Sequence, residues 1–301
     1  RISNMDFIAG IDGGGTKTTI LIGETNGNVI DKVKLGAFNI NSIKEEGFRA
    51  LIDEVISVLN KYGRCLYLTI GAAGVSNSLM RSICEEKFAN ANIPFELVGD
   101  HIIALEGAHN GGPGLAVIAG TGSICFGKGE NGVIERTGGW GHIIGDEGSA
   151  YALGRDIVKY VARDLDGYGK KTVLTTLLAE KFGLSSREEI IKYIYSGDKA
   201  TIAAISPIVD IAYKQNDEVA ISIIEENAKA LALALSGVRK KLKLESAYVS
   251  FFGGLIDKDT PFRSALIKAI NSIDSAICYR DNIHDAATGA LMLSKKGAKN
   301  D

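Results

Sequence analysis

The first third of the chain combines two hydrophobic periodicities. Short apolar, β-branched runs predict strands, and these occupy residues 7–11, 18–23, 29–34, 66–70 and 95–98. Apolar residues at helical spacing predict two helices, over residues 42–62 and 76–88. Asn26-Gly27 separates the second strand from the third and is a strong hairpin signal. Three strands that can pair antiparallel, followed by an αβαβ order, predict a mixed sheet covered by helices.

The same pattern begins again 105 residues later. The matched pairs are Gly15 with Gly120, Thr16 with Thr121, Thr18 with Ser123, Asn26 with Asn131 and Gly27 with Gly132. A second set of three short strands is expected over 115–119, 124–126 and 133–135. Because the same residue types recur at both tight turns and both hairpins, we favour an internal duplication over a chance match. At this offset Asp12 falls on Val117, so the second copy lacks this acid.

The second half carries a long helical stretch, roughly residues 149–242. The elements expected after it are a strand over 247–252, a helix over 261–270, a strand over 276–279 and a final helix near 284–294. The fold class is therefore α/β, with two sheet domains of related plan and a ligand cleft between them. The expected domains are 1–112, joined by the C-terminal helix 284–301, and 113–283, with a helical insertion over about 150–242.

Composition narrows the possible partners. The chain has 301 residues, 46% of them hydrophobic, which is enough for two domains with cores. A net charge of −2 gives no electrostatic footprint for nucleic acid. We expect neither a membrane span nor a signal peptide. The four cysteines form no CxxC pair, which argues against a metal or disulfide framework and favours a cytoplasmic location.

The glycine run after the first strand predicts a phosphate site of an unusual kind. The run, Gly13-Gly14-Gly15, lies between Asp12 and Thr16-Lys17-Thr18. Thr16 stands where a Walker A motif needs lysine, and a strand follows where a dinucleotide fingerprint needs a helix. Glycine N–H groups can still converge on an oxyanion, with the Thr16 and Thr18 hydroxyls as further donors. A tight hairpin without a ligand is the alternative.

The recurrence of this turn at Gly120-Thr121-Gly122-Ser123 favours the phosphate interpretation. Two matching turns facing each other across a cleft predict a nucleoside triphosphate held between the domains. Asp12 is then a candidate partner for Mg²⁺, most simply through water, because Mg²⁺ keeps several waters near phosphates. The alternative for Asp12 is a structural turn cap.

Further candidates follow later strands. Asp100 follows the strand that begins at Phe95 and starts a helix, so it is either an N-cap or an acid that takes a proton from a substrate hydroxyl. The densest glycine region, 138–149, contains Asp146, which either binds sugar hydroxyls or, like Ser149, caps the next helix. The single tryptophan, Trp140, is either core packing or a platform for a ring.

Five motifs occur together in one order over nearly the whole chain. They are DGGGTKT (12–18), AGTGS (119–123), GGWGHIIGDEGSAY (138–151), FFGG (251–254) and AATGAL (286–291). In this combination the chain resembles the N-acetylglucosamine kinase group within the BadF/BadG/BcrA/BcrD ATPase family. That family belongs to the actin-like ATPase superfamily of sugar kinases, Hsp70 and actin. The resemblance implies two RNase H-like domains of duplicated βββαβαβα plan.

The resemblance also implies roles for single residues. Asp100 would be the catalytic base and Asp12 the Mg²⁺ acid. The residues implied for ATP and its phosphates are Gly13, Gly14, Gly15, Thr16, Lys17, Thr18, Gly120, Thr121, Gly122, Ser123, Gly253 and Gly254. The residues implied for the sugar are Asn39, Asp100, Thr121, Gly139 and Asp146.

The expected activity is ATP-dependent phosphorylation of N-acetylglucosamine to its 6-phosphate, with ATP and Mg²⁺ as cofactors. Ile124 stands where animal-type members carry asparagine, so glucosamine, glucose and N-acetylmuramic acid stay open as substrates. One rival is an ATPase that activates a 2-hydroxyacyl-CoA dehydratase or benzoyl-CoA reductase and shares an iron–sulfur cluster between subunits. A second rival is a non-catalytic sugar sensor. We expect a homodimer.

Overall fold

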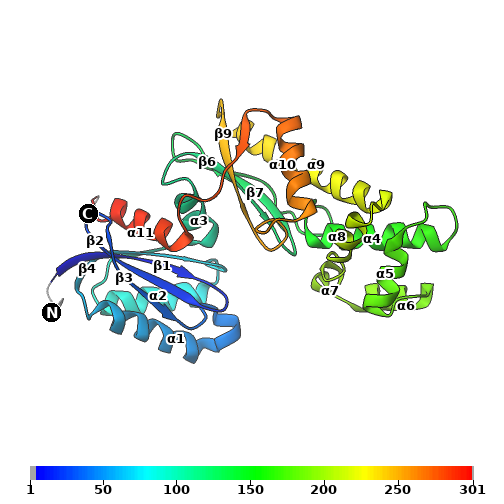
Figure 1. The fold of residues 1–301 in the computed structure, drawn as a ribbon. Helices are drawn as coiled ribbons and strands as arrows, with labels where there is room; N and C mark the ends of the chain where they lie inside the picture. The colour runs from blue at the N-terminus through cyan, green and yellow to red at the C-terminus, as the bar shows by residue number, and fades with distance from the viewer. Residues whose placement is uncertain (1–4, 300–301) are drawn as a thin grey trace. The chain divides into compact units, whose positions relative to one another are not determined.

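A computed structural model describes residues 5–299 of the chain. The chain divides into two compact units. The first consists of Arg1–Gly112 and Asn282–Asp301, and the second of Pro113–Asp281. Each unit contains one five-stranded sheet (Figure 1).

The first unit alternates strands and helices in the predicted order. Its elements are β1 (Met5–Gly13), β2 (Thr18–Glu24), β3 (Val29–Leu35), α1 (Ile40–Leu59), β4 (Gly63–Ala72), α2 (Ser78–Asn90), β5 (Phe95–Gly99), α3 (Asp100–Ala108) and, from the end of the chain, α11 (Ala286–Gly297). The sheet order is β3-β2-β1-β4-β5. β1 pairs antiparallel with β2 and parallel with β4, so the sheet is mixed, as predicted.

The two faces of this sheet are covered by different helices because side chains alternate along β1. Phe7, Ala9 and Ile11 join the core cluster that contains the apolar faces of α1 and α2. Ile8 packs on the other face with Leu291 of α11. Figure 1 shows α1 and α2 on one face of the sheet and α11 on the other. The alternation therefore directs the side chain of Asp12 to the face that α11 covers.

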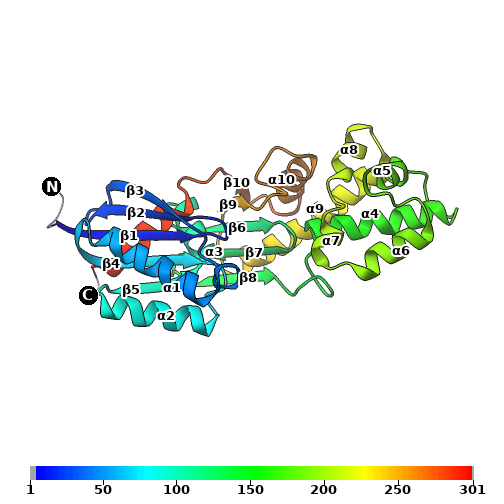
Figure 2. The same cartoon turned by 90° about the horizontal axis from the view of Figure 1, so that it is seen from below.

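The second unit repeats the strand pattern and inserts helices into it. Its elements are β6 (Gly114–Ala119), β7 (Ser123–Lys128), β8 (Ile134–Gly138), α4 (Ala150–Leu165), α5 (Val173–Phe182), α6 (Arg187–Ser196), α7 (Lys199–Ala203), α8 (Ile208–Lys214), α9 (Glu218–Lys241), β9 (Ala247–Phe252), α10 (Pro261–Ile273) and β10 (Ile277–Tyr279). The sheet order is β10-β9-β6-β7-β8. Figure 2 shows α4 to α8 gathered with part of α9 away from the strands.

The two sheets share one plan. Read from the other edge, the second sheet is β8-β7-β6-β9-β10, and its strands pair in the same directions as β3-β2-β1-β4-β5. The turns differ in length, because the last ladder pair is Gly13 with Thr18 in one and Ala119 with Ser123 in the other. The gapless 105-residue offset therefore holds for β2 and β7, whereas β1 and β6 correspond at an offset of 106.

A very close helix contact holds α11 in the first unit. A Cβ added to Gly289 on α11 would lie 1.9 Å from the carbonyl oxygen of Ile103 on α3. A Cβ on Gly10 of β1 would lie 2.2 Å from the backbone nitrogen of Leu291. Ser294 completes the docking, because its hydroxyl donates to Ala9 O at 2.6 Å and accepts from the Thr69 N–H at 2.7 Å. Glycine at positions 10 and 289 is thus a packing requirement.

Across residues 5–299, none of the helices is both long enough and apolar enough to cross a bilayer.

We predict that Gly289→Ala destabilises the first unit by about 1–3 kcal/mol, because the new methyl group would overlap backbone atoms that cannot move aside freely. Gly36→Ala is the matched control, since a Cβ there would meet nothing within 4 Å. Urea denaturation followed by circular dichroism measures both. A Gly289→Ala curve that coincides with the wild-type curve would contradict the assigned contact.

Candidate active site

The first glycine turn joins β1 to β2 and is closed by backbone hydrogen bonds. The Gly14 N–H donates to Lys17 O at 3.0 Å, and the Phe38 N–H donates to Gly14 O at 2.9 Å. Gly15, Thr16 and Lys17 are exposed at the tip. The turn is therefore held in shape by its base, while its tip faces solvent.

Two residues expected at this phosphate site have structural tasks instead. Thr18 is fully buried, and its hydroxyl donates to Gly36 O at 2.7 Å. The expected role of that hydroxyl as a phosphate donor is wrong, because it is buried and already engaged. Gly13 is buried against Phe38, whose ring would lie 2.7 Å from an added Cβ. The glycine at position 13 is explained by this packing.

Other glycines have no such packing explanation. A Cβ on Gly15, Gly36, Gly120 or Gly254 would meet nothing within 4 Å, and none of these four has the positive φ that favours glycine. Three of the four belong to the residues expected to bind ATP. Glycine is suited to such positions when a ligand must approach the backbone closely.

Asp12 lies among other carboxylates at the end of β1. The pKa of Asp12 is raised, mainly by burial and then by the negative charges of Asp100 and Asp285, while Lys17 opposes the shift. Asp100 is the first residue of α3, and Asp285 is the N-cap of α11. The side-chain alternation of β1 explains the cluster, because Asp12 faces the helices that these two acids begin. Three acids thus share one end of the first unit.

Asp100 does not cap its helix. The N-cap of α3 is Gly99, no side chain accepts a capping hydrogen bond there, and the Asp100 carboxylate accepts from the adjacent His101 N–H at 2.8 Å. The capping interpretation of Asp100 is therefore wrong. The His101 side chain holds the pKa of Asp100 below its usual value. Asp100 is exposed and ionised at neutral pH, as a proton acceptor must be.

Asn39 lies at the start of α1, in the loop after β3. Its side-chain oxygen accepts from the Asn41 N–H at 3.0 Å, which makes it the N-cap of that helix. The cap holds the side chain of Asn39 through its oxygen. Binding of a sugar by its amide nitrogen stays a prediction.

The second glycine turn joins β6 to β7 and is braced by the glycine-rich block that follows β8. The Ala150 N–H at the start of α4 donates to Gly120 O at 2.8 Å, and the Ser123 hydroxyl donates to Glu147 O at 2.7 Å. Ser149 is the N-cap of α4, so the cap alternative for Asp146 is wrong. Thr121 is exposed at the tip of the turn.

Asp146 lies directly beside this turn. It is 4% exposed and accepts from the Ser123 N–H at 3.2 Å and from Lys199 Nζ at 2.5 Å. Its φ of 62° is unusual for a residue other than glycine, and such strain is often found at functional sites. Lys199 comes from the helical insertion.

The turn after β9 approaches the same strand end. Gly253 has φ 98°, and a Cβ there would lie 2.5 Å from Ala119 O, so this glycine is required by the backbone of β6. The sequence suggests that Gly253 allows a ligand to approach the backbone closely. In the structure the group that approaches it is the backbone of Ala119. Gly254, by contrast, has open space around it.

Trp140 belongs to an exposed apolar segment of the glycine-rich block. Trp140, Ile143 and Ile144 are 74%, 85% and 71% exposed. The core-packing alternative for Trp140 is therefore wrong, and a platform role stays a prediction. A Cβ on Gly139 would lie 3.0 Å from the side chain of Ile124, so those two residues are neighbours.

The residues present fit a cation at Asp12. Within residues 5–299 no group of three or more His, Cys, Asp or Glu side chains has the arrangement of a complete metal site. A Mg²⁺ ion bound mainly by phosphates and water needs only one carboxylate from the protein. The pKa of Asp12 is raised first by burial and then by two nearby negative charges, and a cation would compensate those charges.

Cys125 does not fit a shared iron–sulfur cluster. Cys125 has no exposed surface, and its thiol donates to Leu231 O at 3.7 Å inside the second core. Burial raises the pKa of Cys125 to about 12, so its thiolate is strongly disfavoured. A cluster held between two subunits needs cysteines at the surface. The alternative function as an activating ATPase is therefore not supported, because Cys125 is its candidate cluster ligand.

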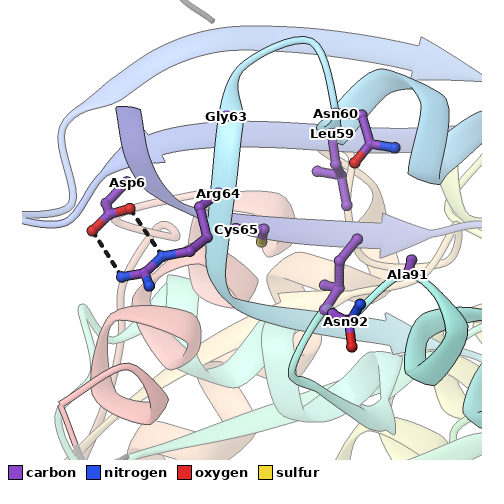
Figure 3. Close-up of a pocket in the computed structure, with 9 residues that line it drawn as sticks. Asp6, Leu59, Asn60, Gly63, Arg64, Cys65, Ala91 and Asn92 are labelled. Carbon is purple, nitrogen blue, oxygen red and sulfur yellow. Dashed lines mark hydrogen bonds and ion pairs between the residues drawn. The ribbon is translucent and has the colours of Figure 1, made fainter. Parts of the chain in front are cut away.

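A separate pocket lies at the opposite end of β1, where β1 and β4 begin (Figure 3). Its volume is about 410 Å³, and Asp6, Asn60, Arg64 and Asn92 are among the lining residues. Figure 3 shows Arg64 pointing to Asp6, with both bonds at 3.0 Å. Because its charged groups are already paired with each other and it lies away from the glycine turn, it is not part of the candidate site.

Two charged residues of the site were not found by sequence reasoning. Asp285 precedes AATGAL, and its carboxylate accepts from the Thr288 N–H at 2.9 Å. The D-x-x-T spacing is a recognisable helix start, but it does not show that α11 returns to the first unit. Lys199 belongs to no sequence motif. It reaches Asp146 only because the helical insertion folds back to the second glycine turn.

We predict that Asp12→Asn raises the melting temperature at pH 7. An unfolded aspartate titrates near 3.8 and folded Asp12 titrates higher, so the folded state binds more protons between those two values. Stability is therefore lost as pH rises through that window, and asparagine cannot ionise. The gain should shrink as pH falls toward 4.

Thermal melts between pH 4 and 8 in a chelator measure this effect. Asp6→Asn is the matched control, because it removes an exposed pair with Arg64 and should not raise the melting temperature. A lower melting temperature for Asp12→Asn at pH 7 would refute the assigned cluster of acids.

The chain is similar to known sugar kinases over nearly its whole length. The N-acetylmuramic acid/N-acetylglucosamine kinase of Clostridium acetobutylicum is 34% identical, covering 97% of this chain and 99% of the relative. The N-acetyl-D-glucosamine kinase of Dictyostelium discoideum is 29% identical, covering 98% and 99%. A solved structure from Chromobacterium violaceum has the same fold, with a TM-score of 0.67 at 23% identity and coverage of 96% and 99%.

The family comparison covers almost the entire chain. A sequence profile described as the BadF/BadG/BcrA/BcrD ATPase family matches residues 9–294. The match includes both glycine turns, the three acids Asp12, Asp100 and Asp285, and the glycine-rich block. The chain is therefore a member of the BadF/BadG/BcrA/BcrD ATPase family.

Proposed function

We propose that this protein is an ATP-dependent sugar kinase that phosphorylates N-acetylglucosamine at its 6-hydroxyl. The observation that carries the proposal is the repeated glycine turn. Each sheet ends its first strand in a turn with an uncrowded glycine, Gly15 or Gly120, and each turn has acids beside it. Phosphoryl transfer depends mainly on positioning and charge neutralisation, which such turns supply.

The first unit supplies the acid–base chemistry in this proposal. Asp100, ionised and exposed, accepts the proton of the sugar hydroxyl as the hydroxyl oxygen bonds to the γ-phosphorus. The bond from that phosphorus to the β,γ-bridging oxygen breaks, and ADP leaves. Asp12 would hold Mg²⁺ through water, and the bound ion would neutralise phosphate charge. Gly15 to Lys17 present backbone N–H groups and the Lys17 ammonium to the phosphates, while the Gly14 N–H closes the turn.

The second unit supplies most of the contacts to the sugar and the remaining phosphate contacts. Asp146 is a strong acceptor beside the turn and would bind sugar hydroxyls, with Gly139 and Thr121 nearby. Gly120 to Ser123 would bind phosphate, and the open space at Gly254 suits the adenosine. Asn39 of the first unit would add an amide donor to the sugar.

The relatives narrow the sugar. The Clostridium relative acts on N-acetylmuramic acid and N-acetylglucosamine, and the Dictyostelium relative on N-acetyl-D-glucosamine. N-acetylmuramic acid is therefore the second substrate that we propose. Ile124, next to Gly139, is the residue that would bear on selectivity for the N-acetyl group, which both of these sugars carry. A homodimer stays a prediction.

The test of the function is ADP release measured against N-acetylglucosamine, N-acetylmuramic acid, glucosamine and glucose, with Mg²⁺ and ATP. We expect the two N-acetylated sugars to stimulate release strongly, and mass spectrometry should show the sugar 6-phosphate. If none of the four sugars raises ADP release above the rate in their absence, the proposal is wrong.

We predict that Asp100→Asn lowers kcat by about 10²–10⁴ and leaves KM for the sugar nearly unchanged. Asparagine can still hydrogen-bond the hydroxyl but cannot take its proton. Asp53→Asn is the matched control, since Asp53 forms a surface pair with Lys87 at 2.7 Å. Steady-state kinetics with a thermal melt of each variant make the comparison. Turnover of Asp100→Asn close to that of Asp53→Asn would remove Asp100 from the chemistry.

A further inference from the structure

Lys199 is a cation that the helical insertion places at the second glycine turn. It is the first residue of α7, whose N-cap Asp198 forms a capping box with Thr201. α7 is pressed onto α4, because a Cβ on Gly154 would lie 2.1 Å from Ile202 O. The backbone of Lys199 is therefore fixed by the cap and by the helix contact.

The ammonium of Lys199 lies directly over the turn. Lys199 Nζ is 2.5 Å from Asp146 Oδ2, and a Cβ on Gly122 would lie 2.7 Å from Nζ. The same Cβ would lie 3.2 Å from both carboxylate oxygens of Asp146. A side chain at position 122 would therefore displace the Lys199 ammonium. The ion pair thus lies against the backbone that we assign to phosphate binding.

The pair is unequally buried. Asp146 has 4% of its side chain exposed, whereas Lys199 has 31%. A buried carboxylate needs a compensating partner, and Lys199 supplies it here. The exposed part of Lys199 leaves its ammonium, with three donors, able to bind a second acceptor from solvent.

We propose that Lys199 is a positioning residue that couples sugar binding to nucleotide binding. This proposal rests on the proposed sugar kinase function. In the free chain Lys199 neutralises Asp146. When sugar hydroxyls donate to Asp146, they replace the ammonium as partners of Oδ2. Lys199 then turns to an anionic oxygen of the nucleotide phosphates at Gly120 to Ser123.

The exchange leaves no group without a partner. The carboxylate gains neutral donors, and the ammonium gains a charged acceptor in place of the one it loses. Lys199 is attracted to Asp146 when no sugar is bound, so the nucleotide must then compete with that carboxylate. Bound sugar removes the competition, and by linkage the nucleotide favours the sugar equally.

Isothermal titration of AMPPNP with Mg²⁺, with and without saturating N-acetylglucosamine, tests the coupling. We expect the sugar to lower the Kd for AMPPNP by about 5- to 20-fold in the wild type, within the usual range of coupling between sites. Lys199→Gln should bring this ratio close to 1, because glutamine can still donate to Asp146 but carries no charge for a phosphate. Lys199→Arg should restore most of it.

Lys170→Met is the matched control and should keep the wild-type ratio, because Lys170 forms an exposed pair with Glu218. A Lys199 that only stabilises Asp146 would change the melting temperature but not the ratio. The proposal for Lys199 alone is overturned if Lys199→Gln keeps the wild-type ratio of AMPPNP Kd values. It is also overturned if the wild type phosphorylates the sugar but shows no coupling. A wild type that binds neither ligand overturns the kinase assignment as well.

Discussion

The backbone contact between α3 and α11 determines the chemistry of the first unit. The two helices can approach so closely only because position 289 has no side chain. Their amino-terminal ends carry Asp100 and Asp285, and the contact brings these ends to the face of β1 that Asp12 occupies. A wider helix spacing would separate the acids and remove the negative charges that add to the effect of burial on Asp12. Packing at a glycine far from the turn thus sets the charge at the turn.

The two turns handle charge in different ways. In the first unit, like charges surround Asp12, so the folded protein carries an unfavourable interaction that a bound cation would relieve. In the second unit, Asp146 is already neutralised by Lys199. The duplicated sheets therefore provide similar backbone at both turns, while the helices that follow provide opposite electrostatics. The insertion of α4 to α8 is the source of this difference.

Much of the fold follows from local pattern. Period-2 runs identify strands such as β9, predicted over the range 247–252 that the structure has, and the mixed sheet follows from their order. The phosphate sites at the glycine turns are also predicted from the sequence, because glycine runs between strands have few explanations, and they stay a prediction. Thr18 and Trp140 show the limit of this reasoning. Whether a hydroxyl is buried, or a tryptophan exposed, depends on contacts with residues far along the chain. Those contacts cannot be inferred from a single sequence.

The docking of α11 also affects how the chain is made. Ser294 donates to Ala9, 285 residues earlier, and accepts from Thr69, 225 residues earlier. The amino-terminal sheet leaves the ribosome long before the helix that covers its second face. During most of translation, apolar residues such as Ile8 and Leu21 therefore lack their native cover. Nascent chains in this condition are prone to aggregation and are natural clients of chaperones, so the synthesis and docking of α11 set when these apolar residues are protected from misassociation.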